Sequence, residues 1–425
     1  MSKNLSYLLL SLYFFTYLVP QYIPSVLIAY DRSIVQFFFI SLVNIFSFAL
    51  IFKSKLTLED IMLRFRYKTH ITAYILFILI AIISTAVAEN QIESIFELAQ
   101  IINLFFAFLF IVIISSNKSI NFLRYFIIVS LLAIAIESFT INYLVYEAVL
   151  KNGDFLTRNN AFSGPGANTI IAAFALVMKL IVPLYLLFTY KNRLVLFISL
   201  ALVYSSILSI LLLMSRGAIL SLVFVLLSII IFTFLSKNKS NYIRLFVLGI
   251  TFIFSFSSYN YFNEKNISDI IVERFSTVST PQSDDSVNER VNFFSTAIKS
   301  IKEKPILGIG IGNWKIKSVG LSKDIIEGYR VPFFAHNDFL QYTAEIGLIG
   351  GLSFIYFIFF PFFLSLKNFL RKLSFDFNFL IFMICGVYVV DSMINFPAHR
   401  PMIFIYLCFT FSLFYYHKSI NVANE

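Results

Sequence analysis

Long apolar runs separated by short polar segments make up most of the chain. Each run has roughly 18 to 25 residues, the length of an α-helix that spans a lipid bilayer. The expected fold class is therefore an all-α polytopic membrane protein with about 12 transmembrane helices. The predicted spans are 5–29, 33–52, 71–88, 95–114, 122–144, 168–190, 194–213, 217–236, 243–262, 338–366, 377–396 and 401–416.

Composition agrees with a membrane protein. Hydrophobic residues make up 59% of the chain, charged residues only 13%, and the mean hydropathy is +0.84. Soluble domains carry about 25% charged residues, so a soluble class is excluded. The two cysteines, Cys385 and Cys408, both fall inside apolar runs. Neither a disulfide framework nor a metal-binding pattern is expected from them.

The net charge of +10 reflects membrane topology rather than nucleic-acid binding. Loops on one side of the predicted spans hold most of the lysines and arginines, which predicts that this side and both chain ends are cytoplasmic. No small-residue cleavage site follows the first apolar run, so it is interpreted as a retained helix and not a signal peptide. The short outer loops carry only Arg32, Lys151, Arg158, Arg216 and Arg400.

One predicted outer segment, 263–335, is too long for a simple connection. It is expected to hold an amphipathic helix that ends at Lys304-Pro305 and lies on the membrane surface or against the bundle. The predicted apolar face of this helix comprises Val287, Val291, Phe294, Ile298 and Ile301. The glycines that follow, at 308, 310 and 312, do not connect a strand to a helix, so a flexible turn is expected rather than a dinucleotide site. The chain divides into helices 1–9 over 1–262, the large periplasmic loop over 263–335, and helices 10–12 over 336–425, within one membrane domain.

Ionisable residues at the outer ends of the spans are the candidate site residues, because charge near the bilayer is costly and commonly functional. His336 opens the tenth span and shares a helical face with Gly347 and Gly350, where another helix could approach. An imidazole at this boundary suits proton transfer, and arginines suit a diphosphate. The other candidates on this side are Arg216, Arg290, Asp391, His399 and Arg400.

Several of these residues also have structural interpretations. Asp391 could form an ion pair with Arg400, and His399 is expected to satisfy its turn. His70 and His417 are expected at the cytoplasmic interface. Lys179 falls in the middle of a span and needs an internal partner or a water-filled cavity.

Taken in order, the motifs resemble those of the O-antigen ligase and O-antigen polymerase superfamily of bacterial polysaccharide assembly. The similarity covers about 200–400, and the N-terminal half agrees mainly in hydropathy. The motifs are Ser215-Arg216-Gly217, Asn288-Glu289-Arg290, Lys304-Pro305 with Gly308 and Gly310, His336-Asn337 with Leu340, Gln341, Glu345 and Gly347, Asp391-Ser392, and Asn395-Phe396-Pro397.

The resemblance implies an inverting glycosyltransferase of the bacterial inner membrane whose active site faces the periplasm. It would move a glycan from undecaprenyl diphosphate to a lipid A-core hydroxyl or another glycan acceptor, without metal or cofactor. His336 would be the general base, Arg216 and Arg290 would bind the diphosphate, and Asp391 would orient an arginine or the acceptor. Asn337 and Arg400 are further substrate-binding candidates. Membrane lipids are expected partners, and nucleic acid is not.

Alternatives remain open at this point. A polymerase that extends lipid-linked repeats would share the donor and the arginines, and a protein O-glycosyltransferase is a further relative. We favour the ligase, because the single His-Asn motif before the tenth span is more typical of ligases. A polysaccharide transporter is disfavoured, since no duplicated half surrounds a midplane site. The sugar, its linkage, the acceptor and the oligomeric state are not predicted.

Overall fold

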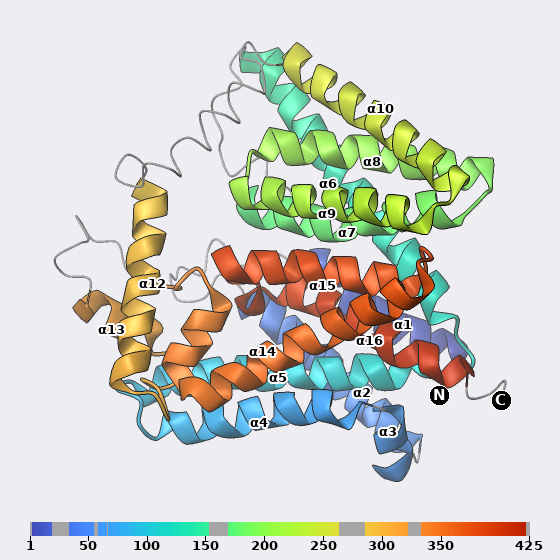
Figure 1. Ribbon diagram of the computed structural model, residues 1–425. Helices are drawn as coiled ribbons and strands as arrows, with labels where there is room; N and C mark the ends of the chain where they lie inside the picture. The colour runs from blue at the N-terminus through green and yellow to red at the C-terminus, as the bar shows by residue number, and fades with distance from the viewer. Residues whose placement is uncertain are drawn as a thin grey trace. The chain divides into compact units, whose positions relative to one another are not determined.

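The computed structural model describes residues 2–18, 34–54, 58–65, 67–152, 169–262, 285–321 and 333–421 (Figure 1). Over these residues the protein is helical and contains no strand. The helices are α1 Lys3–Phe14, α2 Ile34–Lys53, α3 Leu58–Arg64, α4 Lys68–Thr85, α5 Gln91–Ser115, α6 Phe122–Asn152, α7 Thr169–Thr189, α8 Arg193–Leu213, α9 Arg216–Ser236, α10 Lys239–Phe262, α12 Asp285–Glu303, α13 Trp314–Leu321, α14 Asp338–Lys372, α15 Phe377–Ile394 and α16 Pro401–Asn421, with 3₁₀ turns η1 Phe15–Leu18 and η4 Pro397–His399.

Every predicted span overlaps one of these helices. Among the described residues, ten helices are long and apolar enough to cross a membrane, so the chain is a multi-pass membrane protein. The apolar stretch of α16, Pro401–Tyr416, is shorter. The second half of the first predicted span, including Pro20 and Pro24, lies outside the described residues. The full count of about twelve spans stays a prediction, as does the periplasmic side of the large loop.

The helices form two compact units. The first unit comprises Met1–Ile120, Thr280–Pro361 and Ser392–Glu425, and the second comprises Asn121–Ser279 and Phe362–Asp391. The predicted site residues are divided between them. His336, Asn337, Arg290 and Arg400 belong to the first unit, whereas Arg216 and Asp391 belong to the second.

Helix α7 is the most buried helix of the second unit and packs against α6, α8 and α9. It is apolar on all sides, as expected for a helix surrounded by protein. Lys179 lies within it, and its ammonium group contacts both carboxylate oxygens of Glu137 on α6 at 2.8 Å. Both side chains are buried. The internal partner that the sequence requires for Lys179 is therefore Glu137.

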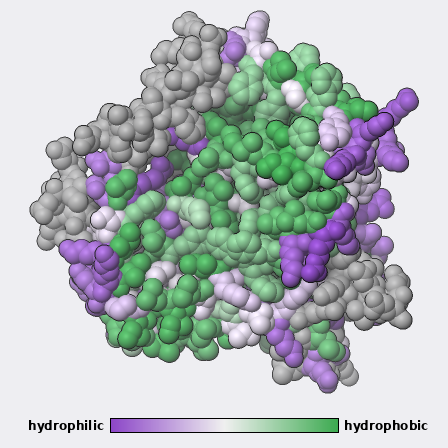
Figure 2. Space-filling view, viewed as in Figure 1, coloured by the Kyte–Doolittle hydropathy of each residue, from purple (hydrophilic) through white to green (hydrophobic). Residues whose placement is uncertain are grey.

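Helix α5 occupies the corresponding place in the first unit, with α1, α2, α4 and α16 around it. The outward face of α2 exposes Phe38, Ile45 and Phe52, spaced seven residues apart. Large apolar side chains exposed in this way suit a helix that faces lipid. Figure 2 shows apolar side chains over much of the visible face, with hydrophilic ones gathered toward its sides.

Helix α12 confirms the predicted amphipathic helix and ends just before Lys304-Pro305, but its predicted apolar face is wrong in part. Val291 and Ile298 are 51% and 44% exposed. The buried side chains are those of Phe293 and Ala297, which pack with Trp314, Ala335 and Ala344. Arg290 shares this face at helical spacing, so the helix directs it inward.

His70 is also placed differently from its prediction. It is completely buried within the first unit and is not an interface residue. Its Nδ1 lies 2.7 Å from the Tyr415 hydroxyl and its Nε2 lies 2.8 Å from the Phe357 carbonyl. Both ring nitrogens therefore have partners, and the side chain is structural. The side chain of His417 lies outside the described residues.

Helix α14 is broken at Gly347, whose φ of 77° and ψ of 177° are not helical. The segment after α12 docks at the break: Leu348 donates to the Pro305 carbonyl at 2.8 Å, and Ile309 donates to the Ala344 carbonyl at 3.0 Å. A Cβ on Gly347 would overlap the carbonyl of Ile306. The close approach predicted at Gly347 is thus made by a loop and not by another helix.

The glycine-rich turn is packed tightly, contrary to the prediction of a flexible turn. Gly308, Gly310 and Gly312 all have positive φ values. A Cβ at each would collide respectively with the backbone of Glu345, with Ala88, and with Glu93. Glycine is required here because the backbone needs both left-handed angles and close contacts.

Candidate functional site

His336 stands immediately before α14 in a left-handed conformation, with φ of 54°. Such an angle is uncommon outside glycine and is often found at functional positions. On one side, the Ala335 N–H donates to Gln341 Oε1 at 2.9 Å. On the other side, Asn337 caps the helix by accepting the Leu340 N–H at 3.0 Å. The backbone that carries the imidazole is therefore held at both flanks.

Asn337 has a second role in this arrangement. Its Nδ2 donates to the Met393 carbonyl at 3.1 Å, so both ends of its amide contact protein. Because its amide is already bonded to protein, Asn337 is better suited to positioning the start of α14 than to the predicted substrate binding. The start of α14 is thereby joined to the end of α15.

Aromatic rings surround the imidazole of His336. The ring of Phe293 lies nearly parallel, with centroids 6.1 Å apart, and Phe396 packs edge-on at 5.0 Å. These rings limit the contact of the imidazole with solvent. The buried Nδ1 of His336 has no hydrogen-bond partner among the described residues.

Two arginines add positive charge at His336. Burial and the charge of Arg290 lower the pKa of His336 to about 4, and the charge of Arg400 acts in the same direction. A hydrogen bond with Asn395 opposes the shift. At pH 7 the imidazole is neutral, which is the form that accepts a proton.

Arg400 is buried and lies over aromatic rings. Its guanidinium carbon is 4.6 Å from the ring centroid of Phe396 and 5.9 Å from that of Phe334. Contacts of a guanidinium with an aromatic face contribute about 0.5–2 kcal/mol, depending on desolvation. Phe396 therefore contacts both the imidazole of His336 and the charge of Arg400.

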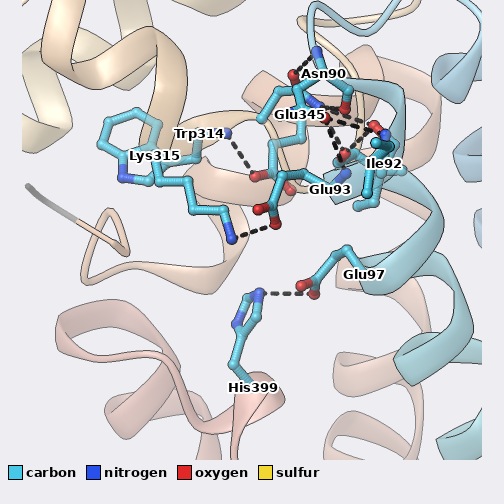
Figure 3. A network of polar contacts seen from close by, with 11 residues as sticks. Asn90, Ile92, Glu93, Glu97, Trp314, Lys315, Glu345 and His399 are labelled. Carbon is cyan, nitrogen blue, oxygen red and sulfur yellow. Dashed lines mark hydrogen bonds and ion pairs between the residues drawn. The ribbon is translucent and has the colours of Figure 1, made fainter. Parts of the chain in front are cut away.

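His399, on the 3₁₀ turn before α16, does more than satisfy its turn. Its Nε2 lies 3.1 Å from Glu97 Oε1, and its Nδ1 lies 3.3 Å from Asp338 Oδ1 (Figure 3 shows the pair with Glu97). Burial alone would lower the pKa of His399, but the charges of the two carboxylates outweigh it and raise the pKa to about 10. At pH 7, His399 is charged while His336 is neutral.

A cavity of about 560 Å³ lies beside the His399–Glu97 pair, within the first unit. Helices α2 and α5, the segment around Lys315 and the start of α14 contribute to its wall. Lys315 contacts Glu93 at 2.5 Å, and the Trp314 N–H donates to Glu345 Oε1 at 3.0 Å (Figure 3). His336 is not among the residues that line this cavity, although Phe334 is.

The remaining predicted residues lie in the second unit. Arg216 begins α9 after a tight turn in which Met214 has a φ of 50° and Ser215 caps the helix through the Ala218 N–H. Arg216 is half-buried, and Asp391 is buried in α15. The contribution of both residues to the site stays a prediction, as does the pairing of Asp391 with Arg400.

The comparison with protein families agrees with the motif order. Residues 200–355 match the family described as O-Antigen ligase. Over this segment the chain is similar to the O-antigen ligase superfamily. The matched segment contains Arg216, Arg290 and His336, while Asp391 and Arg400 follow it. No curated protein matches the chain.

The match to this family implies lipid-linked glycan substrates in a membrane context. Among the described residues, no three His, Cys, Asp or Glu side chains are grouped so as to hold a metal ion. The Asp284-Asp285 side chains lie outside the described residues.

Sequence reasoning missed the half-buried polar side chains at the start of α5. Glu93, Glu97 and Gln100 follow one another at helical spacing at the start of an otherwise apolar span. That polar stripe was the available signal for a site on α5. Glu345 was noticed within a motif, but its contact with Trp314 depends on the break at Gly347, which no periodicity indicates.

Proposed function

We propose that this protein is an O-antigen ligase that transfers a glycan from undecaprenyl diphosphate to a lipid A-core hydroxyl at the periplasmic face of the inner membrane. One observation carries the proposal: the ring of Phe396 contacts both the imidazole of His336, at 5.0 Å, and the guanidinium of Arg400, at 4.6 Å. This arrangement combines a proton acceptor with groups that bind phosphate oxygens. The superfamily match supports the proposal.

In the proposed reaction the acceptor hydroxyl oxygen attacks the anomeric carbon and gives its proton to His336. The bond between that carbon and the diphosphate oxygen breaks, and the diphosphate leaves with the electron pair. A single displacement inverts the anomeric configuration. Arg290 and Arg400, together with Arg216 as the motif implies, would stabilise the negative charge on the leaving group.

The charges around His336 suggest that donor binding activates the base. A histidine with a pKa of about 4 is neutral at pH 7 but weakly basic. A diphosphate beside Arg290 and Arg400 would cancel part of the positive potential that lowers this pKa. The imidazole would therefore become a stronger base once the donor is in place.

The deciding experiment is a gel of surface lipopolysaccharide from cells whose only copy of the gene carries His336→Ala. The ligase proposal expects bare core, with long glycan retained on the lipid carrier. Lys299→Ala is a matched control, because this exposed lysine lies on α12 together with Arg290. It should give the wild-type ladder.

Other patterns on the gel would overturn parts of the proposal. Core that carries a single repeat would identify the protein as the polymerase, since ligation would then survive the substitution. An unchanged ladder, with His336→Ala present in the membrane at the wild-type level, would remove His336 from the chemistry.

A further inference from the structure

The cavity beside His399 and Glu97 has the properties of a ligand site of its own. Its volume of about 560 Å³ is within the range of small-molecule pockets, roughly 300 to 1,000 Å³. Five phenylalanines and nine polar side chains are among its lining residues, so it is more polar than most small-molecule pockets. Its wall includes α2 and α5, which lie outside the segment that matches the superfamily.

Glu345 provides independent evidence for a ligand. Its side chain lines the cavity and is completely buried. One oxygen, Oε1, accepts the Trp314 N–H, whereas Oε2 has no hydrogen-bond partner among the described residues. A buried carboxylate oxygen without a donor is costly, so a ligand that donates a hydrogen bond would stabilise it.

The other charged groups of the wall are already paired with one another. Glu93 contacts Lys315, and Glu97 contacts the imidazolium of His399. Glu345 forms no ion pair within the described part of the chain, and both cations of the wall, Lys315 and His399, already contact carboxylates. An anionic ligand would therefore find no unpaired cation among these residues, whereas hydroxyl or ammonium donors could bond to Glu345.

The remaining polar groups suit a ligand with many hydroxyls. The amides of Gln100, Asn103 and Gln341 line the same cavity. Asn103 and Gln341 also bond within the protein, because Asn103 Oδ1 accepts from Asn44 and Gln341 Oε1 accepts the Ala335 N–H, and an amide can make further hydrogen bonds to a ligand. The rings of Phe37, Phe96 and Phe334 supply apolar surface beside them. A pyranose ring has this same division, with hydroxyls at its edge and carbon-bound hydrogens on its faces.

We infer that this cavity binds a non-anionic sugar unit, either uncharged or carrying an amine. Phe334 lines the cavity and stacks on Phe396 with centroids 4.1 Å apart, and Phe396 packs against His336. The two rings of Phe334 and Phe396 therefore separate the bound sugar from His336, so this sugar is a neighbour of the unit whose hydroxyl reacts. The inference that the cavity binds a sugar is supported by the cavity alone. The inference that this sugar is part of the acceptor rests on the proposed function.

The test is saturation-transfer difference NMR on the full-length protein in detergent, with glucose, glucosamine and glucuronate as separate probes. Glucose and glucosamine are expected to give saturable signals, and glucuronate none. Glu345→Gln should weaken binding of glucosamine about tenfold, which corresponds to about 1.4 kcal/mol, because it removes a charge-assisted hydrogen bond. Glu303→Gln is the matched control, since this exposed carboxylate on α12 lies outside the cavity lining. It should bind as the wild type does.

Equal binding of glucuronate, or wild-type binding by Glu345→Gln, would overturn the sugar site. If Glu345→Gln does not fold, Gln100→Ala replaces it, and undiminished binding by that variant would overturn the site equally. His336→Ala should still bind glucose, which separates failure of the cavity from failure of the proposed function. Normal glycan transfer by a Glu345→Gln protein that has lost sugar binding would overturn the acceptor assignment alone.

Discussion

The carboxylate of Asp338 accepts the backbone N–H of Ala398 at 2.9 Å. This bond joins a residue two positions after His336 to a residue two positions before Arg400. The other carboxylate oxygen of Asp338, Oδ1, lies 3.3 Å from His399 Nδ1, so Asp338 also orients the turn between α15 and α16. His336 and Arg400 are thus held together by a contact that involves neither of them.

The pH dependence of transfer should report the charges at His336. Because the free protein holds the pKa of His336 at about 4, kcat/KM should stay flat from pH 7 to about 5 and fall below that. Arg290→Ala removes a positive charge, so its acid limb should move to higher pH while transfer becomes slower. Lys299→Ala should leave the profile in place. The rates can be measured with purified protein and lipid-linked donor, and an unmoved limb in Arg290→Ala would contradict the electrostatic account.

The stability of the first unit should fall in alkaline solution because of His399. The pKa of His399 is about 10 in the folded protein and near 6.5 in the unfolded chain. The contribution of His399 to the free energy of unfolding is therefore complete below pH 6.5 and is lost as pH rises through 10. The thermal unfolding temperature in detergent should therefore drop between pH 7 and pH 10. His399→Gln should be less stable at pH 7 and should show a smaller drop. Parallel curves for the two proteins would mean that His399 is not the group responsible.

The buried pair of Lys179 and Glu137 should stabilise the second unit only as a pair. Lys179→Met leaves an uncompensated carboxylate and should cost about 3–5 kcal/mol of unfolding free energy. The double variant Lys179→Met with Glu137→Leu should recover most of that loss, because apolar replacements of buried pairs are often neutral. Denaturation of the purified variants in detergent checks both values. A double variant no better than the single one would indicate that the pair has a role beyond stability.

The break at Gly347 should tolerate no side chain. Alanine there combines a positive φ with an overlap at the Ile306 carbonyl, so Gly347→Ala should cost more than about 2 kcal/mol. Gly249→Ala is the control, because a Cβ on this helical glycine meets nothing within 4 Å. It should be neutral or stabilising by up to about 1 kcal/mol. Unfolding in detergent compares the two, and equal stability would contradict the break.

Periodicity was enough to place the helices, and motif order was enough to indicate the superfamily. Both signals are local: an apolar run needs only its own length, and a motif needs only its own spacing. What they could not predict depends on contacts between distant segments. The face of α12 that packs is decided by the Trp314 region and not by the most apolar side of the helix. The pairing of His399 with Glu97 joins residues about 300 positions apart, which no spacing rule covers.

Trp314 makes the first unit observable without a label. It is the only tryptophan in the chain, it is 1% exposed, and its backbone is bonded to the carboxylate that lines the cavity. Excitation at the red edge avoids the 23 tyrosines, so the emission would come from this one indole. Binding of a ligand in the cavity should change the fluorescence emission of Trp314. Detachment of the loop that packs at Gly347 should also change it. Trp314 can therefore report on the inferred sugar site through its backbone bond to Glu345.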